Sequence, residues 1–113
     1  MLENKSLISG STSMLLLSLL SEKDMYGYEM IETLHLRSNH VFDLKAGTLY
    51  PLLHSLVDKG YLESYEDLES TKKRKYYRIT KKGRKHLKSI SEEWEEYAKA
   101  VKGVIGGVTF GTV

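Results

Sequence analysis

Hydrophobic residues recur at helical spacing in four places along this chain. The first segment, from about Lys5 to Leu20, is apolar around most of its circumference and predicts a helix buried on more than one side. In a chain of 113 residues, such burial fits packing against a second subunit as well as it fits the central helix of a monomer. A second helix is predicted from Met25 or Tyr26 to about Leu36, with Asp24 as its N-cap.

A third helix is predicted from Leu44 or Lys45 to Gly60, because a glycine suits the left-handed residue that ends many helices. Pro51 conflicts with a helix interior, where it removes a backbone hydrogen bond, so we expect a kink or a tightened first turn. The apolar stripe of this helix is Leu49, Leu52, Leu53, Leu56 and Val57. The opposite face carries Lys45, Thr48, Tyr50, Pro51, His54 and Ser55.

After the third helix, the hydrophobic pattern changes from a helical period to the alternation of strands. Tyr61 to Asp67 and Arg74 to Thr80 alternate like strands, with Tyr77 and Ile79 on one side. The polar residues between them predict a hairpin with a basic tip, and Val41 to Asp43 could pair as a minor strand. Helix, turn, helix and hairpin follow in the order of a winged helix-turn-helix, so we expect an α+β fold that is mainly α.

A last helix is predicted from after Thr80, a suitable N-cap, to Gly103 or slightly past it. Its apolar residues alternate between spacings of three and four, the seam of a heptad repeat that mates with one partner helix. An amphipathic helix packed only on its own core needs a wider stripe, so the narrow seam favours a dimer. The seam residues are Leu87, Ile90, Trp94, Tyr97, Val101, Val104 and Val108.

The expected organisation is therefore one compact unit with two parts. Residues 1–80 form a winged helix-turn-helix, and residues 81–113 form a dimerisation helix with a tail.

Positive charge is concentrated in one stretch. The net charge is only +2, yet ten basic residues and no acidic one lie between Lys72 and Lys88. Such a run is often only a solvated face, but one of a single sign beside a helix-turn-helix pattern indicates binding to double-stranded DNA. The candidate contacts to a major groove are Lys45, Thr48, Tyr50 and His54. The candidate contacts of the hairpin to phosphates or a minor groove are Lys72, Lys73, Arg74, Lys75 and, unless it only supports the hairpin, Tyr76.

Other classes of function find little support in the sequence. The chain has no cysteine, and its four histidines include no pair at i, i+4, so we expect no disulfide and no metal site. No nucleophile–base arrangement or glycine-rich phosphate loop is present, so neither an enzyme nor a cofactor is expected. The apolar run from Met14 to Leu20 is too short to span a bilayer, and a soluble cytoplasmic protein is expected.

Four runs of residues resemble the PadR family of bacterial transcriptional regulators. They are Tyr26-Gly27-Tyr28-Glu29, Ala46-Gly47-Thr48-Leu49-Tyr50-Pro51-Leu52-Leu53, Lys59-Gly60-Tyr61-Leu62 and Arg74-Lys75-Tyr76-Tyr77-Arg78-Ile79-Thr80. The resemblance covers roughly residues 10 to 100 and is to the compact subfamily with a single C-terminal helix. It implies a homodimeric repressor on a palindromic operator, with phenolic acids or planar hydrophobic drugs as effectors of some members.

The resemblance also gives Trp94 a second interpretation. On general grounds, Trp94 on the seam is simple packing, but in drug-binding relatives an aromatic residue of the matching helix stacks on flat ligands between the subunits. The expected lining of such a cavity is Ser13, Leu16, Ser91, Trp94 and Ala98. A dimeric protein-interaction adaptor remains the alternative function, although an adaptor has no need for the basic stretch.

Overall fold

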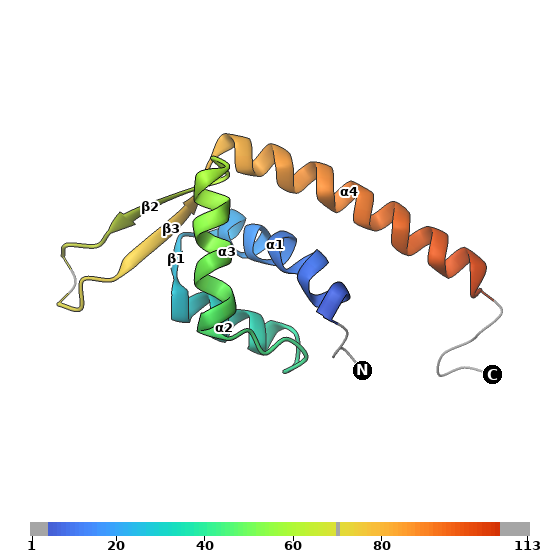
Figure 1. Ribbon diagram of the computed structural model, residues 1–113, viewed down its shortest axis with the longest axis horizontal. Helices are drawn as coiled ribbons and strands as arrows, with labels where there is room; N and C mark the ends of the chain where they lie inside the picture. Colours follow the sequence, from blue (N-terminus) through green and yellow to red (C-terminus); the bar gives the residue numbers. More distant parts are fainter. Residues whose placement is uncertain (1–4, 70, 107–113) are drawn as a thin grey trace.

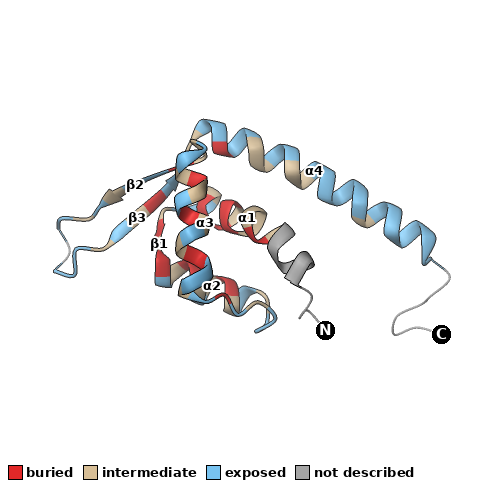
Figure 2. Ribbon diagram, viewed as in Figure 1, coloured by how far each residue is buried: buried red, intermediate tan, exposed pale blue. Residues whose placement is uncertain are grey.

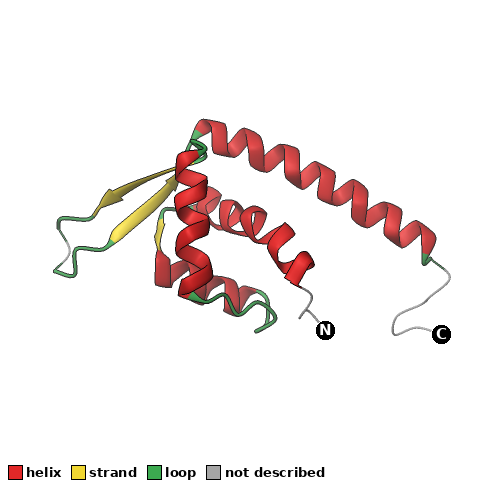
Figure 3. Cartoon of the chain, in the orientation of Figure 1, coloured by secondary structure: helices red, strands yellow, loops and turns green. Residues whose placement is uncertain are grey.

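The computed structural model describes residues 5–69 and 71–106. In this part of the chain, helices pack at one end of a small three-stranded sheet whose β2–β3 hairpin projects away from them, and the α+β, mainly α fold class is confirmed (Figures 1 and 3). The elements are α1 (Lys5–Glu22), β1 (Met25–Tyr26), α2 (Gly27–Arg37), α3 (Ala46–Asp58), β2 (Leu62–Glu66), β3 (Lys75–Ile79) and α4 (Lys81–Val104). None of the helices in the described residues is long and apolar enough to cross a membrane.

The hydrophobic core lies where α1, α2 and α3 meet the inner face of the sheet (Figure 2). Leu16 of α1, Met30 of α2 and Leu49 of α3 are completely buried. Tyr77 and Ile79 of β3 are also buried, which confirms the predicted alternation of that strand. The helix order and the hairpin thus follow the hydrophobic pattern, because burial of these side chains is the main favourable term in folding.

The sheet differs from the prediction at one edge. β3 pairs with β2 in antiparallel register, from Leu62 opposite Ile79 to Glu66 opposite Lys75, as the hairpin prediction required. Its other edge pairs with β1, where Met25 lies opposite Tyr77. The prediction of a minor strand at residues 41–43 is wrong, because β1 occupies the edge of β3 and residues 41–43 form a loop.

The start of α2 also differs from the prediction. Tyr26, not Asp24, is the N-cap, and its backbone N–H donates to Oε1 of Glu29 at 3.4 Å. Asp24 lies two residues earlier and accepts a hydrogen bond of 2.6 Å from the hydroxyl of Tyr65. The carboxylate therefore joins the first helices to the hairpin and does not cap a helix.

The predicted cap of α4 is confirmed. The Oγ1 atom of Thr80 accepts a hydrogen bond of 2.9 Å from the backbone N–H of Gly83 and donates one of 2.7 Å to the carbonyl of Gly60. Beyond its first turns, α4 extends away from the rest of the molecule, and most of its far half is exposed (Figures 1 and 2). Val108, the last position of the predicted seam, lies outside the described residues.

Candidate functional site

The tip of the β2–β3 hairpin, which we call the wing, carries exposed basic side chains. Lys72, Lys73 and Lys75 are exposed, and Lys73 has a left-handed backbone with φ of 46°. Arg74 differs from them, because its guanidinium lies 4.2 Å from the ring centroid of Tyr26 and is half-buried. This cation–π contact fixes the wing to the start of α2.

A cluster of three tyrosine rings supports the wing. Tyr76 packs between Tyr26 and Tyr65, at ring-centroid distances of 5.5 Å and 5.8 Å. Tyr65 and Tyr76 are cross-strand partners, and such aromatic pairs stabilise sheets. The hydrogen bond to Asp24, followed by burial, raises the pKa of Tyr65. Tyr76 is half-buried in this arrangement, which favours a role as a support of the hairpin over a role as a DNA contact.

The outward face of α3 presents part of the set of residues that the sequence placed there. Thr48, Pro51 and His54 are exposed, whereas Ser55 is half-buried. Lys45, which precedes the helix, is also exposed, and its Nζ lies 3.0 Å from Oδ2 of Asp43. An ion pair this exposed contributes little to stability, so Lys45 can exchange Asp43 for another anion at small cost.

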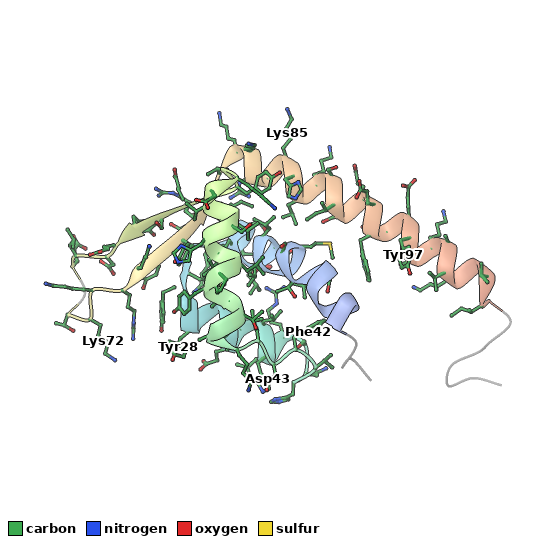
Figure 4. The ribbon with its side chains drawn as sticks, in the orientation of Figure 1. Tyr28, Phe42, Asp43, Lys72, Lys85 and Tyr97 are labelled. Carbon is green, nitrogen blue, oxygen red and sulfur yellow. The ribbon has the colours of Figure 1, made fainter. Side chains whose placement is uncertain are left out.

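Tyr50 does not share the exposed face of α3. Its ring is half-buried, and its hydroxyl lies against Gly27, where a side chain would collide with it. A hollow of about 430 Å³ lies between α3 and the wing, with Tyr50 on its wall. Tyr28 stands at the same hollow with 68% of its surface exposed (Figure 4). The sequence pattern singled out Tyr50 and missed Tyr28, although both belong to the runs that carried the family resemblance.

The basic stretch does not form one continuous ribbon. Lys72 lies on the wing, whereas Lys85 points outward from the first turns of α4, away from the wing and α3 (Figure 4). Thr80 separates the two groups, because the chain turns there from β3 into α4. Only the wing half of the stretch lies beside the hollow described above.

A second hollow, of about 350 Å³, lies between α1 and α4. Of the five predicted cavity residues, Ser13 and Trp94 line it, and Ser91 and Ala98 do not. Leu16 is completely buried in the core, so it offers no surface to a ligand there. The other lining residues are Met14, His86, Ile90, Glu93 and Tyr97.

The remaining seam positions divide into two groups. Leu87 and Ile90 are half-buried and pack against the core of their own chain. Trp94, Tyr97 and Val101 expose 45%, 59% and 38% of their surface. The seam thus begins as core and continues as an exposed apolar stripe along the far half of α4.

Comparisons with known proteins agree on one family. The sequence profile of the transcriptional regulator PadR-like family matches residues 16–89. A protein of Lysinibacillus sphaericus is 38% identical over 96 residues, which are 84% of this chain and 88% of the relative. A transcriptional regulator of Mycobacterium tuberculosis is 38% identical over 66 residues, which are 58% of this chain and 62% of that protein.

Solved structures give the same result. A transcriptional regulator from Clostridium thermocellum superimposes with a TM-score of 0.78 at 38% identity, covering 93% of this chain and 99% of the other. A PadR family transcriptional regulator from Eggerthella lenta superimposes with a TM-score of 0.76 at 35% identity, covering 88% and 86%. With the winged hairpin, the third helix and the matched residues in agreement, the chain belongs to the PadR-like family of transcriptional regulators, which are not enzymes.

Proposed function

We propose that this regulator is a cytoplasmic homodimeric repressor that binds a palindromic operator and is released from it by a small aromatic or hydrophobic effector. The observation that carries the proposal is the exposed apolar stripe of α4. The helix continues well past the body of the protein with Trp94, Tyr97 and Val101 on its surface (Figure 2).

A second copy of the chain is the partner that suits this stripe. An unsupported helix of a few turns is only marginally stable in water, because most helical stability in proteins comes from packing an apolar face. The alternation of three and four along the stripe is the spacing at which two helices interlock. Two copies related by a twofold axis bury the same residues from both sides, as closed symmetric dimers do.

The dimer supplies the proposed symmetry of the operator. Each copy presents one α3 and one wing, so the twofold axis relates two DNA-reading units and the operator has two inverted half-sites. The exposed Thr48 and His54 on α3 are our candidates for base contacts. The exposed Lys72, Lys73 and Lys75 of the wing are our candidates for phosphate contacts, and Tyr28 joins them because of its exposure beside the wing.

The effector proposal rests on the hollow between α1 and α4. It opens beside the apolar stripe, so a second copy packed on that stripe would cover part of its mouth. Trp94 and Tyr97 offer aromatic rings at a centroid distance of 6.0 Å, and flat aromatic molecules stack well on such rings. To regulate, the effector must prefer one spacing of the two α3 helices over the other.

A substitution in the stripe tests the proposal. Val101→Glu places a charge in the proposed interface, while Ser89→Glu adds the same charge at an exposed position of α4 off the seam. Sedimentation at micromolar concentration should give twice the chain mass of 12.9 kDa for the natural protein and for Ser89→Glu, and a monomer for Val101→Glu. Fluorescence anisotropy with DNA from the promoter of its own gene should show tight binding only for the two dimers.

The adaptor alternative predicts a different result in the same assay. A dimeric adaptor would keep the mass of a dimer but bind promoter DNA no better than an acidic polymer of equal charge. A reporter gene behind that promoter then separates repression from activation: deletion of the regulator should raise expression if the protein is a repressor. A monomeric natural protein would contradict the proposed twofold operator.

A further inference from the structure

Two imidazole rings face each other at the end of α2. Nδ1 of His40 lies 2.6 Å from Nε2 of His35, and the rings meet edge to face with centroids 4.3 Å apart. The two residues are five apart in sequence, a spacing that does not place them on one face of a helix. They meet because α2 ends at Arg37 and the chain folds back on itself.

The backbone that brings the rings together is unusual. Asn39 and His40 are consecutive non-glycine residues in the left-handed region, with φ of 52° and 69°. This region is sparsely populated by such residues, and its cost is often associated with function. The backbone N–H of His40 donates to the carbonyl of His35 at 2.7 Å, which holds the turn in place. His40 is thereby directed back over the last turn of α2.

The contact that Nδ1 of His35 makes determines which nitrogen of the ring carries the lone pair. Its Nδ1 lies 3.3 Å from the carbonyl oxygen of Phe42, and only a protonated Nδ1 can donate to a carbonyl. In a neutral ring, the lone pair is then on Nε2 and points at His40. Metal-binding histidines are oriented in this way, with the distal nitrogen ligating and the other one bound to a carbonyl or carboxylate.

We propose that His35 and His40 together bind one divalent transition-metal ion that favours imidazole, namely Cu²⁺, Ni²⁺ or Zn²⁺, with water in the remaining positions. In a tetrahedral site, two nitrogens with metal bonds of about 2.0–2.1 Å are about 3.3 Å apart. A small rotation of the exposed His40 ring opens the present contact to that separation. The proton on Nδ1 of His40, which faces the lone pair of His35, leaves to Nε2 of the same ring or to solvent, so that both nitrogens can ligate the ion. Copper is expected to bind most tightly of the three.

The surroundings set the strength of the site. In the described residues, no group of three or more histidine, cysteine or acidic side chains is arranged to hold a metal, so the protein supplies two ligands. Binding through two ligands is labile and exchangeable. The carboxylate of Asp43, which interacts electrostatically with His35, is engaged by Lys45 at 3.0 Å. An ion held here would tie the end of α2 to the loop before α3, at a place separate from the hollow that Trp94 lines.

Calorimetric titration of the untagged full chain with CuCl₂, NiCl₂ or ZnCl₂ at pH 7.5 tests this proposal. We expect one ion per chain. His35→Gln and His40→Asn should each weaken binding at least tenfold. Asparagine tolerates the left-handed backbone at position 40, so that variant removes the imidazole while keeping the turn. His54→Gln and His86→Gln remove a histidine elsewhere and should leave binding unchanged.

One further condition sharpens the result. MgCl₂ should give no saturable heat, since Mg²⁺ prefers oxygen ligands. The absence of saturable binding by all three transition metals overturns the proposal, as does binding that survives both His35→Gln and His40→Asn. Either result would leave the pair as a hydrogen-bonded helix end.

Discussion

Tyr61 and His86 stack face to face, with ring centroids 4.1 Å apart and planes that differ by only 4°. Tyr61 precedes β2 and is fixed at both ends: its N–H donates to the carbonyl of Leu56, and its carbonyl accepts from the N–H of Thr80, each at 3.0 Å. His86 lines the hollow that also contains Trp94. The stack therefore connects the end of α3 and the base of the wing to the wall of the proposed effector site.

Gly83 allows the start of α4 to pack closely against Tyr61. It is buried, and a Cβ atom there would collide with the carbonyl of Tyr61 and lie 2.8 Å from Cγ1 of Ile79. We expect Gly83→Ala to lower the free energy of unfolding by about 1–3 kcal/mol, more than the gain of about 0.5–1 kcal/mol that alanine brings to a helix. Urea unfolding followed by circular dichroism measures the difference.

Gly103 provides the matched control for that experiment. It lies in the same helix, and a Cβ atom added there meets nothing within 4 Å. Gly103→Ala should therefore be neutral or slightly stabilising. If both variants lose the same stability, the close approach of Gly83 to Tyr61 is not what excludes a side chain.

The side-chain hydroxyl of Thr80 makes hydrogen bonds on both sides of the junction between the wing and α4. Its Oγ1 accepts from Gly83 and donates to the carbonyl of Gly60. Thr80→Ala should destabilise the protein by about 0.5–2 kcal/mol, the usual cost of losing such a cap. Thr80→Ser retains the hydroxyl and should recover most of that loss in a thermal or urea melt. Equal instability of both variants would assign the effect to the methyl group and not to the cap.

Removal of the wing charges should weaken binding to DNA of any base sequence. Replacement of Lys72, Lys73, Arg74 and Lys75 by alanine should make the dependence of log K on log salt shallower by about 0.9 for each true phosphate contact. The loss should be similar on operator and random DNA. Because Arg74 also packs on Tyr26, its single variant should lower stability as well, which a separate melt would detect.

Lys85 serves as the control for charge alone. It is exposed on α4 and points away from the wing (Figure 4). Lys85→Ala should leave the salt dependence close to that of the natural protein, whereas Lys73→Ala should reduce it. Equal reductions would mean that the whole basic stretch contacts DNA, contrary to the division that the fold imposes on it.

The sequence pattern predicted most elements and failed where side chains from distant segments decide the outcome. The apolar stripe of α3 and the alternation of Tyr77 and Ile79 could be predicted from the sequence, because buried positions recur with a fixed period along a helix or strand. The edge strand at Met25 has only two residues, too few to show a period. Leu16 was assigned to a ligand cavity because spacing along a helix cannot distinguish a core position from a cavity wall.

Stability should fall at alkaline pH in part because of Tyr65. Its hydrogen bond to Asp24, and then burial, raise its pKa in the folded protein above the ordinary value of 10.0. A group whose folded pKa is raised contributes stability that is present below its unfolded pKa and is lost as pH rises through the folded one. Tyr65→Phe should therefore be less stable at pH 8, and its unfolding free energy should decline less steeply above pH 10. A variant with an unchanged alkaline slope would show that Tyr65 does not contribute to it.

Substitution of Trp94 by leucine distinguishes a role in packing from a role in ligand binding, because the two roles require different properties of the side chain. Trp94→Leu retains an apolar side chain for the stripe of α4 but removes the indole face on which a flat molecule would stack. We expect the variant to sediment as a dimer and to bind operator DNA normally. Affinity for a planar aromatic effector should fall by about 0.5–1.5 kcal/mol from stacking alone, or about two- to tenfold in Kd.

The tryptophan fluorescence of the natural protein measures ligand binding directly. Trp94 is the only tryptophan in the chain, so quenching of its emission by a ligand reports on this side chain alone. With 45% of its surface exposed in a single chain, its replacement should not unfold the core. If Trp94→Leu instead sediments as a monomer, the indole is needed for packing between the subunits and the proposed effector site is wrong. If the variant remains a dimer and binds the effector with unchanged affinity, the ligand binds elsewhere, and quenching by it arises from a change of conformation.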